Sequence, residues 1–583
     1  GISRAEPYLC LDGQAAPRFA LRICAHLIAP TSSPKGEAPV AGLRLRCDVS
    51  QLDPSSAEAV LQLQDMAPWF EHNAWIHFLA PRGLEQYSGG GWGTRDVCQG
   101  PVEMLLAQAQ VQPVRDLLQR TFAAQNPNGD WPQWFMFYPR DAHIRAGDSH
   151  GDIVFWPLLA LARYLLASAD AEFLNEKVPF HGEPVAVTVS EHVERALALI
   201  QARCIGGTHL ASYWHGDWND SLQPADPELR ERMCSGWTVT LHHQTLTTLA
   251  QALQSLGHEL RAQDLQARAA QVAQDFQRYL VVNDVVTGYA LFDSGRGVVQ
   301  NSPSPQHLIH PTDHLTGLRY SLLPMMHAVL EDLLEPHQAQ HQMALMAQHL
   351  WAPDGARLFD APMVYRGGLQ RLFQRAESSA FFGREIGVMY THAHLRYAET
   401  LAHMGQAEAF FQALSLAHPI GLRQRLPQAK ARQANCYYSS SDAAFADRYE
   451  AMTGYRQIAQ GTVALEGGWR VYSSGPGIAL RLVLCKWLGV ECTKSLVRLD
   501  PVMPATLDGL RAHLQICDRP VEVTYRVGAS GHGVREVMLN GQSLSFSRQA
   551  NRYRLGAAVL ARSCVEPLLR ERDNRLEVHL GQA

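Results

Sequence analysis

The sequence lacks the features by which membrane and nucleic-acid-binding proteins are usually found. No apolar run approaches the roughly 18 residues that a membrane-spanning helix needs, and no signal peptide is visible. No run of Lys or Arg stands out, and the formal net charge of the 583 residues is only -5. These absences argue against nucleic acid or a membrane as partner. We expect a small, mostly uncharged ligand.

Cysteine is also sparse, and it follows no recognisable pattern. The eleven cysteines are an odd number and include no CxxC pair, which excludes a regular disulfide framework or a zinc site of the usual spacing. Free or buried thiols indicate a reducing compartment, so we predict a cytoplasmic protein. His and Asp residues between His143 and Asp152 have metal-ligand chemistry, but they lie in a glycine-containing loop without a HExxH helix. We therefore predict no metal and no cofactor.

Helical periodicity dominates residues 55–494. Leucines recur at helical spacing, as in Leu158, Leu161 and Leu165, and we count about a dozen such segments. Long loops rich in glycine and aromatic residues separate them. This pattern predicts a mainly α protein with an (α/α)6 barrel as catalytic domain, whose loops at one end build the site. A solenoid is the competing architecture, but no fixed repeat period is present.

Strand patterns flank the helical region. Residues 19–25 and 42–48 read as strands, and we assign residues 1–54 to the remnant of an N-terminal β-sandwich within a longer parent chain. Residues 495–583 predict a C-terminal β-sandwich. Its clearest element is a hairpin over residues 534–546 that turns at Asn540-Gly541, the favoured pair for a type I′ turn.

The stretch from Trp214 to Ser221 gathers two carboxylates, two indoles, an imidazole and an amide. Indole faces stack on the apolar face of a pyranose, and Asp and Asn reach its hydroxyls. A carboxyl group shielded among aromatic rings can stay protonated and act as an acid. We predict Asp220 as the proton donor to a glycosidic oxygen. The alternative is a polar loop whose indoles simply fill the core.

Two further loops carry groups suited to a sugar. Residues 82–96 contain three consecutive glycines, which let the backbone approach a ligand, followed by Arg95 and Asp96 as donor and acceptor. A structural Arg95–Asp96 pair is the alternative. Residues 128–138 form an aromatic loop that leads to Asp152. Asp152 precedes an apolar helix, so an N-cap role is also open.

Two places suit an anion. Ser473 to Gly477 precede an apolar run, so that hydroxyls and N–H groups would lie at a helix N-terminus. His392 lies in a helical stretch, where an imidazole can hydrogen-bond a phosphate. A lone histidine in a helix is usually structural, and only the combination favours phosphate.

These motifs resemble the inverting glycoside phosphorylases of the cellobiose phosphorylase type, glycoside hydrolase family 94. The resemblance rests on Gly216 to Asp220, on the Gly-Gly-Gly-Trp-Gly-Thr-Arg-Asp loop and on the Ser-Gly-Pro-Gly turn, and it covers residue 65 to the end. Residues 133–135, 217–224 and 437–445 look most like the members that act on β-1,2-linked glucans. Cys234 and Gly100 depart from the cellobiose phosphorylase pattern.

The resemblance implies that Asp220 is the general acid and that inorganic phosphate is the co-substrate. It implies phosphate ligands at His392, Ser474, Gly475 and, more loosely, Arg82. We assign substrate binding to Arg95, Asp96, Gln99, Trp134, Arg145, Asp152, Trp218, Asn219, Trp237 and Glu377. A homodimer is compatible with the resemblance.

The function we predict is reversible, inverting phosphorolysis of β-1,2-linked glucooligosaccharides to α-glucose 1-phosphate and a shortened glucan. Three alternatives remain. The enzyme could act on another β-linked glucoside, or it could be an inverting hydrolase with Glu85, Glu377 or Asp96 as base. The third is an inactive carbohydrate-binding homologue.

Overall fold

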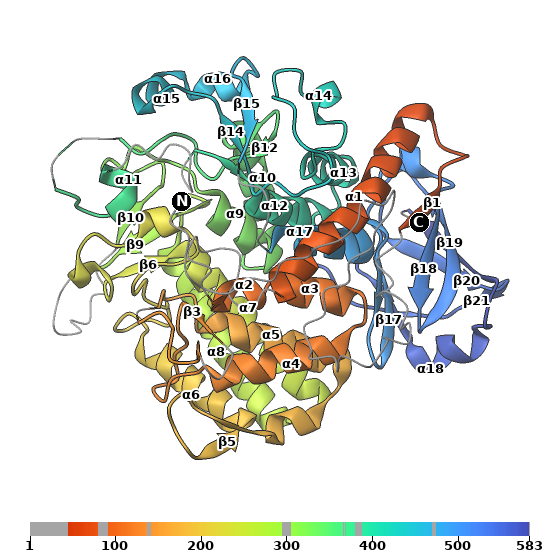
Figure 1. The fold of residues 1–583 in the computed structure, drawn as a ribbon, viewed down its shortest axis with the longest axis horizontal. Helices are drawn as coiled ribbons and strands as arrows, with labels where there is room; N and C mark the ends of the chain where they lie inside the picture. The colour runs from red at the N-terminus through yellow and green to blue at the C-terminus, as the bar shows by residue number, and fades with distance from the viewer. Residues whose placement is uncertain are drawn as a thin grey trace, which may run out of the picture. The chain divides into compact units, whose positions relative to one another are not determined.

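The computed structural model combines helices and strands (Figure 1). It describes residues 45–79, 91–136, 141–147, 149–293, 305–364, 367, 369–378, 387–468 and 474–581. All of these ranges belong to one unit, Leu43–Ala583. The predicted strand over residues 19–25, Glu85 and the phosphate ligand Arg82 lie outside the described residues.

Helices fill the region between the first strand and residue 487. The main ones are α1 (Pro54–Leu79), α2 (Thr94–Val97), α3 (Gly100–Ala107), α4 (Val111–Ala123), α5 (Phe155–Ser168), α6 (Val189–Ala202), α7 (Gly236–Ser255), α8 (Glu259–Tyr279), α9 (Leu322–Leu330), α10 (Pro336–His349), α11 (Gln374–Ser378), α12 (Thr391–His403), α13 (Ala407–Leu416) and α17 (Gly475–Leu482). Their apolar stripes face each other, so that α7 packs against α5 and α8, and α12 against α9 and α13. Leu158, Leu161 and Leu165 are fully buried on α5, as their spacing predicts.

Residues 455–465 and 477–489 are two of the segments whose periodicity predicts a helix, and both end differently in the structure. The stretch 455–465 forms only the short helix α16 (Arg456–Ala459), because Gly461 has a φ of 71° and the chain then enters strand β15 (Leu465–Gly467). The stretch 477–489 forms α17 and then a π-helical turn, η5 (Val483–Trp487). Such turns are rare and occur mostly as single insertions in α-helices.

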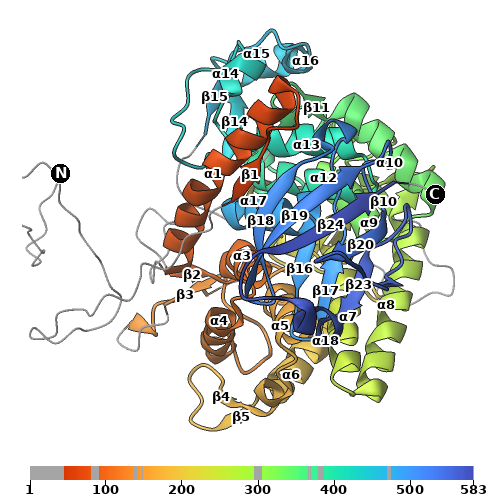
Figure 2. The same cartoon turned by 90° about the vertical axis from the view of Figure 1, so that its right-hand side faces the viewer.

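Strands follow from residue 490 (Figure 2). A six-stranded sheet has the order β1-β18-β19-β24-β20-β21, and a four-stranded sheet has the order β16-β17-β23-β22. Their bounds are β1 (Arg46–Asp48), β16 (Val490–Cys492), β17 (Leu496–Leu499), β18 (Arg511–Ile516), β19 (Arg519–Val527), β20 (Val534–Leu539), β21 (Gln542–Ser543), β22 (Ser547–Arg548), β23 (Ala558–Ala561) and β24 (Asn574–Leu580). Val497 and Leu560 of one sheet line the same apolar space as Val521 and Val537 of the other. The two sheets therefore share a core.

The hairpin predicted at Asn540-Gly541 is confirmed. Asn540 has a φ of 53° and Gly541 a φ of 84°, and β20 pairs antiparallel with β21. Positive φ at both central residues is what a type I′ turn requires.

The strand predicted before residue 54 belongs elsewhere. β1 pairs antiparallel with β18, with Arg46 opposite His513, so it forms the edge of the C-terminal sheet. Asp48 also forms an ion pair with Arg511. This differs from our assignment to an N-terminal sandwich, because the partner strand lies more than 400 residues away in sequence and no local pattern marks it.

Within the described ranges, no helix is both long and apolar enough to cross a membrane. In the same part of the chain, no group of three or more His, Cys, Asp or Glu side chains is arranged to hold a metal ion.

Candidate active site

A buried ion pair joins two of the predicted sugar-binding residues. Arg95 on α2 donates from Nη2 to Oδ1 of Asp152 at 2.8 Å, and its Nε lies 2.8 Å from Oδ2. Trp156 Nε1 donates to the same Oδ2 at 2.9 Å. Asp152 is completely buried, so every oxygen it offers is engaged by protein. Its carboxylate orients Arg95, whereas no N-cap bond from its side chain is seen at α5.

His150 lies between this ion pair and the Trp214–Ser221 stretch. Its Nδ1 is 2.8 Å from the carbonyl oxygen of Asp217 and 3.1 Å from Arg95 Nη2. Gln223 Nε2 lies 2.8 Å from its Nε2. Because a carbonyl can only accept, Nδ1 carries the proton and Nε2 accepts from the amide. Burial, together with the charge of Arg95, lowers the pKa of His150, so the imidazole is neutral.

Asp220 is the first residue of a short 3-10 helix, η3 (Asp220–Leu222), and Asn219 caps that helix by accepting from Ser221 N. Oδ1 of Asp220 lies 3.6 Å from His150 Nδ1. This oxygen is shielded from solvent and accepts no hydrogen bond from the described residues. The side chain as a whole is 40% exposed. Asp220 therefore presents a carboxyl group at a surface, as a proton donor to a bound ligand must.

Asp217 has the opposite environment. It is 1% exposed, and its Oδ1 accepts from Asn219 N at 2.9 Å. Burial and the charge of Asp152 raise the pKa of Asp217 to about 7. Asp217 therefore shapes the loop from within, and only Asp220 of the two carboxylates reaches outward.

The Trp218 ring holds this loop against α12. Its ring centroid lies 4.9 Å from that of Tyr390 and 5.3 Å from that of His392, both edge to face. His392 is the second residue of α12, so it lies beside the free N–H groups of a helix N-terminus. Burial lowers the pKa of His392 to about 3, which keeps the imidazole neutral. The structure thus brings the loop of the predicted acid to the predicted phosphate ligand.

Ser474 and Gly475 lie at the start of α17, against the Arg95 segment. Ser474 Oγ donates to the carbonyl oxygen of Asp96 at 3.0 Å. A Cβ on Gly100 would lie 2.1 Å from the carbonyl oxygen of Ser474, and one on Gly475 would lie 2.0 Å from Tyr437 Oη. Gly100 is thus explained, because a side chain there would separate α3 from α17.

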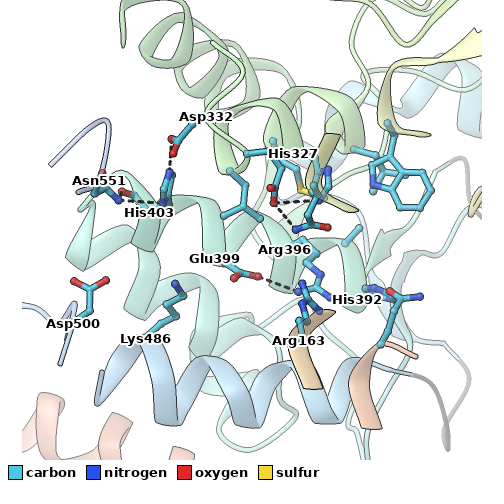
Figure 3. A pocket seen from close by; sticks show the side chains of 18 of the residues that line it. Arg163, His327, Asp332, His392, Arg396, Glu399, His403, Lys486, Asp500 and Asn551 are labelled. Carbon is cyan, nitrogen blue, oxygen red and sulfur yellow. Dashed lines mark hydrogen bonds and ion pairs between the residues drawn. The ribbon is translucent and has the colours of Figure 1, made fainter. Parts of the chain in front are cut away.

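One cavity of about 280 Å³ connects several of these groups. Gln99, Trp218, Trp237 and His392 line one part of it, and the labelled residues of Figure 3 show how far it continues beyond His392. Gln99 is almost fully buried and donates to the carbonyl oxygen of Arg95 at 3.2 Å.

Other predicted substrate ligands are engaged elsewhere. Glu377 accepts from Leu372 N and Phe373 N at 2.8 Å, and from Arg371 N at 2.6 Å, so both its oxygens hold the backbone of its own loop. Arg145 donates to Ala124 O at 2.9 Å and to Asn126 Oδ1 at 2.8 Å.

Two tryptophans of the predicted aromatic loops also have protein partners. Trp134 lies in strand β3 (Trp134–Phe135), which pairs with β2 (Trp92–Gly93). Arg203 places its guanidinium 4.3 Å from the ring centroid of Trp214. One face of Trp214 is thus covered by a cation.

The chain is similar in sequence to known carbohydrate-active enzymes. Residues 63–311 match the family model of the glycosyl hydrolase 94 superfamily, catalytic domain. This segment of the chain is similar to the glycosyl hydrolase 94 catalytic domain. The match confirms the resemblance predicted from its loops.

Two curated relatives extend the likeness beyond the glycosyl hydrolase 94 segment. A 1,2-beta-oligoglucan phosphorylase of Listeria innocua is 39% identical over 502 residues, which are 84% of this chain and 44% of the relative. The cyclic beta-(1,2)-glucan synthase NdvB of Rhizobium meliloti is 22% identical over 473 residues, 77% of this chain and 15% of the relative. The chain thus spans less than half the length of either relative.

Solved structures are more distant. The match to a family 78 rhamnosidase of Bacillus sp. GL1 covers 84% of this chain and 42% of the rhamnosidase chain. The TM-score is 0.45 and the sequence identity is 11%. At this TM-score, the likeness supports no conclusion about the candidate site.

His150 is a residue of the candidate site that the sequence did not predict. The loop between His143 and Asp152 was weighed as a metal site or as sugar contacts, but its contact with Asp220 crosses 70 positions. The available signal was the pair of histidines flanking a glycine-containing loop, which does not reveal the partner.

Proposed function

We propose that this chain catalyses inverting phosphorolysis of β-1,2-linked glucooligosaccharides on an (α/α)6 barrel. The observation that carries the proposal is the 39% identity to a 1,2-beta-oligoglucan phosphorylase over 502 residues. The contact of the Trp218 ring, two residues before Asp220, with His392 also supports it. The products would be α-glucose 1-phosphate and a shortened glucan, and the reaction would be reversible.

Asp220 supplies the proton in this mechanism. Its carboxyl group is partly exposed and has an unbonded oxygen, while His150 and the buried Asp217 hold the loop beneath it. The proton passes to the glycosidic oxygen as the bond from that oxygen to the anomeric carbon breaks. The resulting carboxylate faces the Nδ1–H of His150 and takes a proton back from solvent or from the next phosphate.

Phosphate is the nucleophile that forms the new bond to the anomeric carbon. His392 and the first N–H groups of α17, beside Ser474 and Gly475, are the groups proposed to hold it. A phosphate oxygen attacks the anomeric carbon from the face opposite the leaving glucan, which inverts its configuration from β to α. Phosphate is already an anion, so no second carboxylate has to activate it.

An inverting hydrolase needs such a second carboxylate, about 6.5–9.5 Å from the acid, to activate water. Of the candidates, Glu377 spends both oxygens on backbone N–H groups of residues 371–373. This engagement favours the phosphorylase over a hydrolase that uses Glu377 as its base.

The test is cleavage of β-1,2-, β-1,3-, β-1,4- and β-1,6-linked glucobioses and their trimers, with and without inorganic phosphate. We expect α-glucose 1-phosphate from the β-1,2-linked substrates only, and no cleavage without phosphate. Equal rates without phosphate would establish a hydrolase. Preference for another linkage would contradict the proposal that the substrate is β-1,2-linked.

A matched pair of variants tests the acid. Asp220→Asn should lower turnover by about 10²- to 10⁴-fold, as loss of a general acid does. Asp226→Asn is the control, because Asp226 is exposed and caps a neighbouring turn, a role that Asn fills equally well. Equal activity of both variants would contradict the assignment of Asp220.

A further inference from the structure

The cavity that begins at His392 extends away from the Asp220 loop toward the C-terminal strands. Arg163, Arg396, Lys486 and Arg498 line its far part, and Gln549 and Asn551 line it on the strand side. Figure 3 shows His392 on one side of this space and Asp500 and Asn551 on the other. None of these far residues was predicted as functional from the sequence.

Three of the acidic side chains that line this cavity are already paired with protein side chains. Glu399 lies 3.0 Å from Arg396 and also pairs with Arg481. Asp500 accepts two bonds from Arg554, at 2.7 and 2.8 Å. Asp332 lies 2.9 Å from His403.

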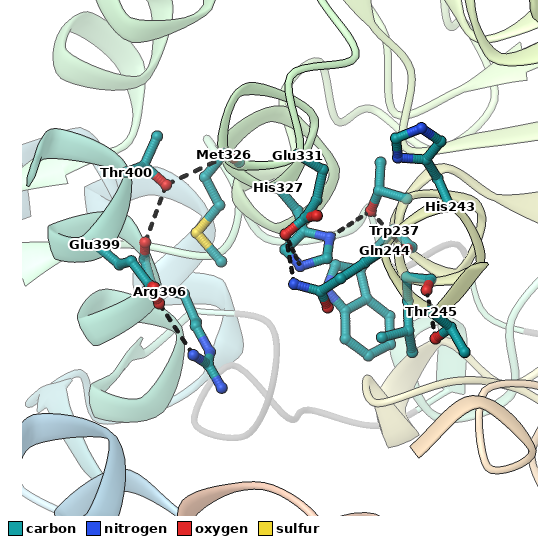
Figure 4. A network of polar contacts seen from close by, with 12 residues as sticks. Trp237, His243, Gln244, Thr245, Met326, His327, Glu331, Arg396, Glu399 and Thr400 are labelled. Atoms are coloured by element: carbon teal, nitrogen blue, oxygen red, sulfur yellow. Dashed lines mark hydrogen bonds and ion pairs between the residues drawn. The ribbon is translucent and has the colours of Figure 1, made fainter. Parts of the chain in front are cut away.

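Glu331 is the remaining acid of the lining, and it is uncharged at neutral pH. Burial raises the pKa of Glu331 to about 8. Figure 4 shows it bonded to Gln244 and close to His327, whose Nε2 lies 3.9 Å away. Below about pH 8, Glu331 does not repel an anion in the cavity.

Three of the four cations of the far part have carboxylate partners. Arg163 Nη1 donates to Glu103 at 3.0 Å, Arg396 pairs with Glu103 and Glu399, and Arg498 pairs with Glu491. Among the described residues, the Lys486 ammonium has no hydrogen bond or ion pair. The charges that act on it are Glu399 and Asp500, which attract it, and Arg498 and Arg481, which repel it.

Two features indicate that the Lys486 side chain has a role in the cavity. It is carried by the π-helical turn η5, and π turns inside helices are frequent at functional sites. Figure 3 shows its side chain extending toward the space between Glu399 and Asp500. The Lys486 side chain is half-buried and desolvation lowers its pKa, so an anion bound beside the ammonium would stabilise its charge.

We propose that the far part of this cavity is a second oxyanion site, which binds inorganic phosphate at Lys486. Lys486 supplies the charge, and the side-chain amide nitrogen Nε2 of Gln549, which donates to no described residue, supplies a further N–H. The site is distinct from the phosphate position at His392, although the same cavity reaches both. Binding here does not depend on the proposed phosphorolysis, and only the choice of phosphate among oxyanions rests on it.

The test is calorimetric titration of the full chain with inorganic phosphate in a His392→Ala background, which removes a ligand at the other end. Lys486→Met should weaken the remaining binding by about tenfold or more, as loss of a charged hydrogen bond does. Lys486→Arg keeps the charge and should keep the binding. Lys494→Met, at an exposed lysine of the same segment, is the control and should bind as the parent does.

Absence of phosphate binding in the His392→Ala parent, or equal binding by Lys486→Met and Lys494→Met, would overturn the proposal. Binding of α-glucose 1-phosphate without binding of phosphate would overturn phosphate as the ligand. Crystals soaked in tungstate locate the site by anomalous scattering. A peak beside Lys486 supports the proposal, and peaks only elsewhere contradict it.

Discussion

Nδ1 of His150 lies 3.6 Å from Oδ1 of Asp220 and 2.8 Å from the carbonyl oxygen of Asp217. One N–H thus faces both the loop that carries the acid and the acid itself. Gln223 holds the ring from its other side, at Nε2. His150 therefore positions Asp220, whereas the proton in the reaction comes from the carboxyl group.

Replacing His150 tests this role. His150→Ala should lower kcat by about 10- to 100-fold through misplacement of the acid, with little change in the KM for phosphate. His150→Asn offers an amide N–H near the position of Nδ1 and should recover part of the loss. Steady-state kinetics of both variants give the answer, and equal kcat values for Asn and Ala would contradict a positioning role.

Arg95→Ala should destabilise the protein by about 3–5 kcal/mol, because it leaves the fully buried Asp152 without its cation. Urea unfolding measures the change. Adding Asp152→Asn to Arg95→Ala should restore part of the stability, since the uncompensated charge is then gone. A double variant less stable than Arg95→Ala would show that the ion pair is not the cause.

Gly100→Ala should disrupt the contact between α3 and α17, since its Cβ would lie 2.1 Å from the carbonyl oxygen of Ser474. We expect loss of thermal stability together with loss of activity. Gly206→Ala is the control, because nothing lies within 4 Å of a Cβ there. Similar melting temperatures for the two variants would contradict the close approach.

Glu331 makes stability depend on pH. Its pKa rises from 4.5 to about 8 on folding, so the folded chain holds a proton that the unfolded chain releases between these values. The contribution of Glu331 to the free energy of unfolding is therefore most favourable at low pH and falls as the pH rises toward 8. Glu331→Gln removes the titration, so its advantage over the parent should grow by a few kcal/mol between pH 5.5 and 8.5, at about 1.4 kcal/mol per pKa unit. Unfolding by urea at both pH values measures it, and a constant difference would contradict it.

Local chemistry predicted several features of the structure. The Asn540-Gly541 turn follows from the need for positive φ at two adjacent residues, and the buried leucines of α5 follow from helical spacing. The Asp220 stretch was identified because its residue types alone suit a sugar and a proton.

Long-range pairing limited the rest of the prediction. Asp152 was predicted to bind substrate, but its partner Arg95 stands 57 residues earlier and covers it. β1 joins a strand more than 400 residues away. Lys486 lies in an apolar helix in sequence, and only the assembled cavity shows that its ammonium has no ion pair with any described residue. Contacts of this kind depend on the packed chain, not on the spacing of residues.

The central claim is that phosphate, and not water, takes the glucosyl unit while Asp220 protonates the leaving oxygen. Its most direct test is cleavage of a β-1,2-linked glucobiose with phosphate in ¹⁸O-labelled water, followed by ³¹P and ¹H NMR and mass spectrometry of the products. We predict α-glucose 1-phosphate without ¹⁸O at the anomeric position, formed by the parent and reduced to a trace by Asp220→Asn. Two molecules of free glucose per disaccharide cleaved without glucose 1-phosphate, or product formation unchanged in Asp220→Asn, would contradict the account.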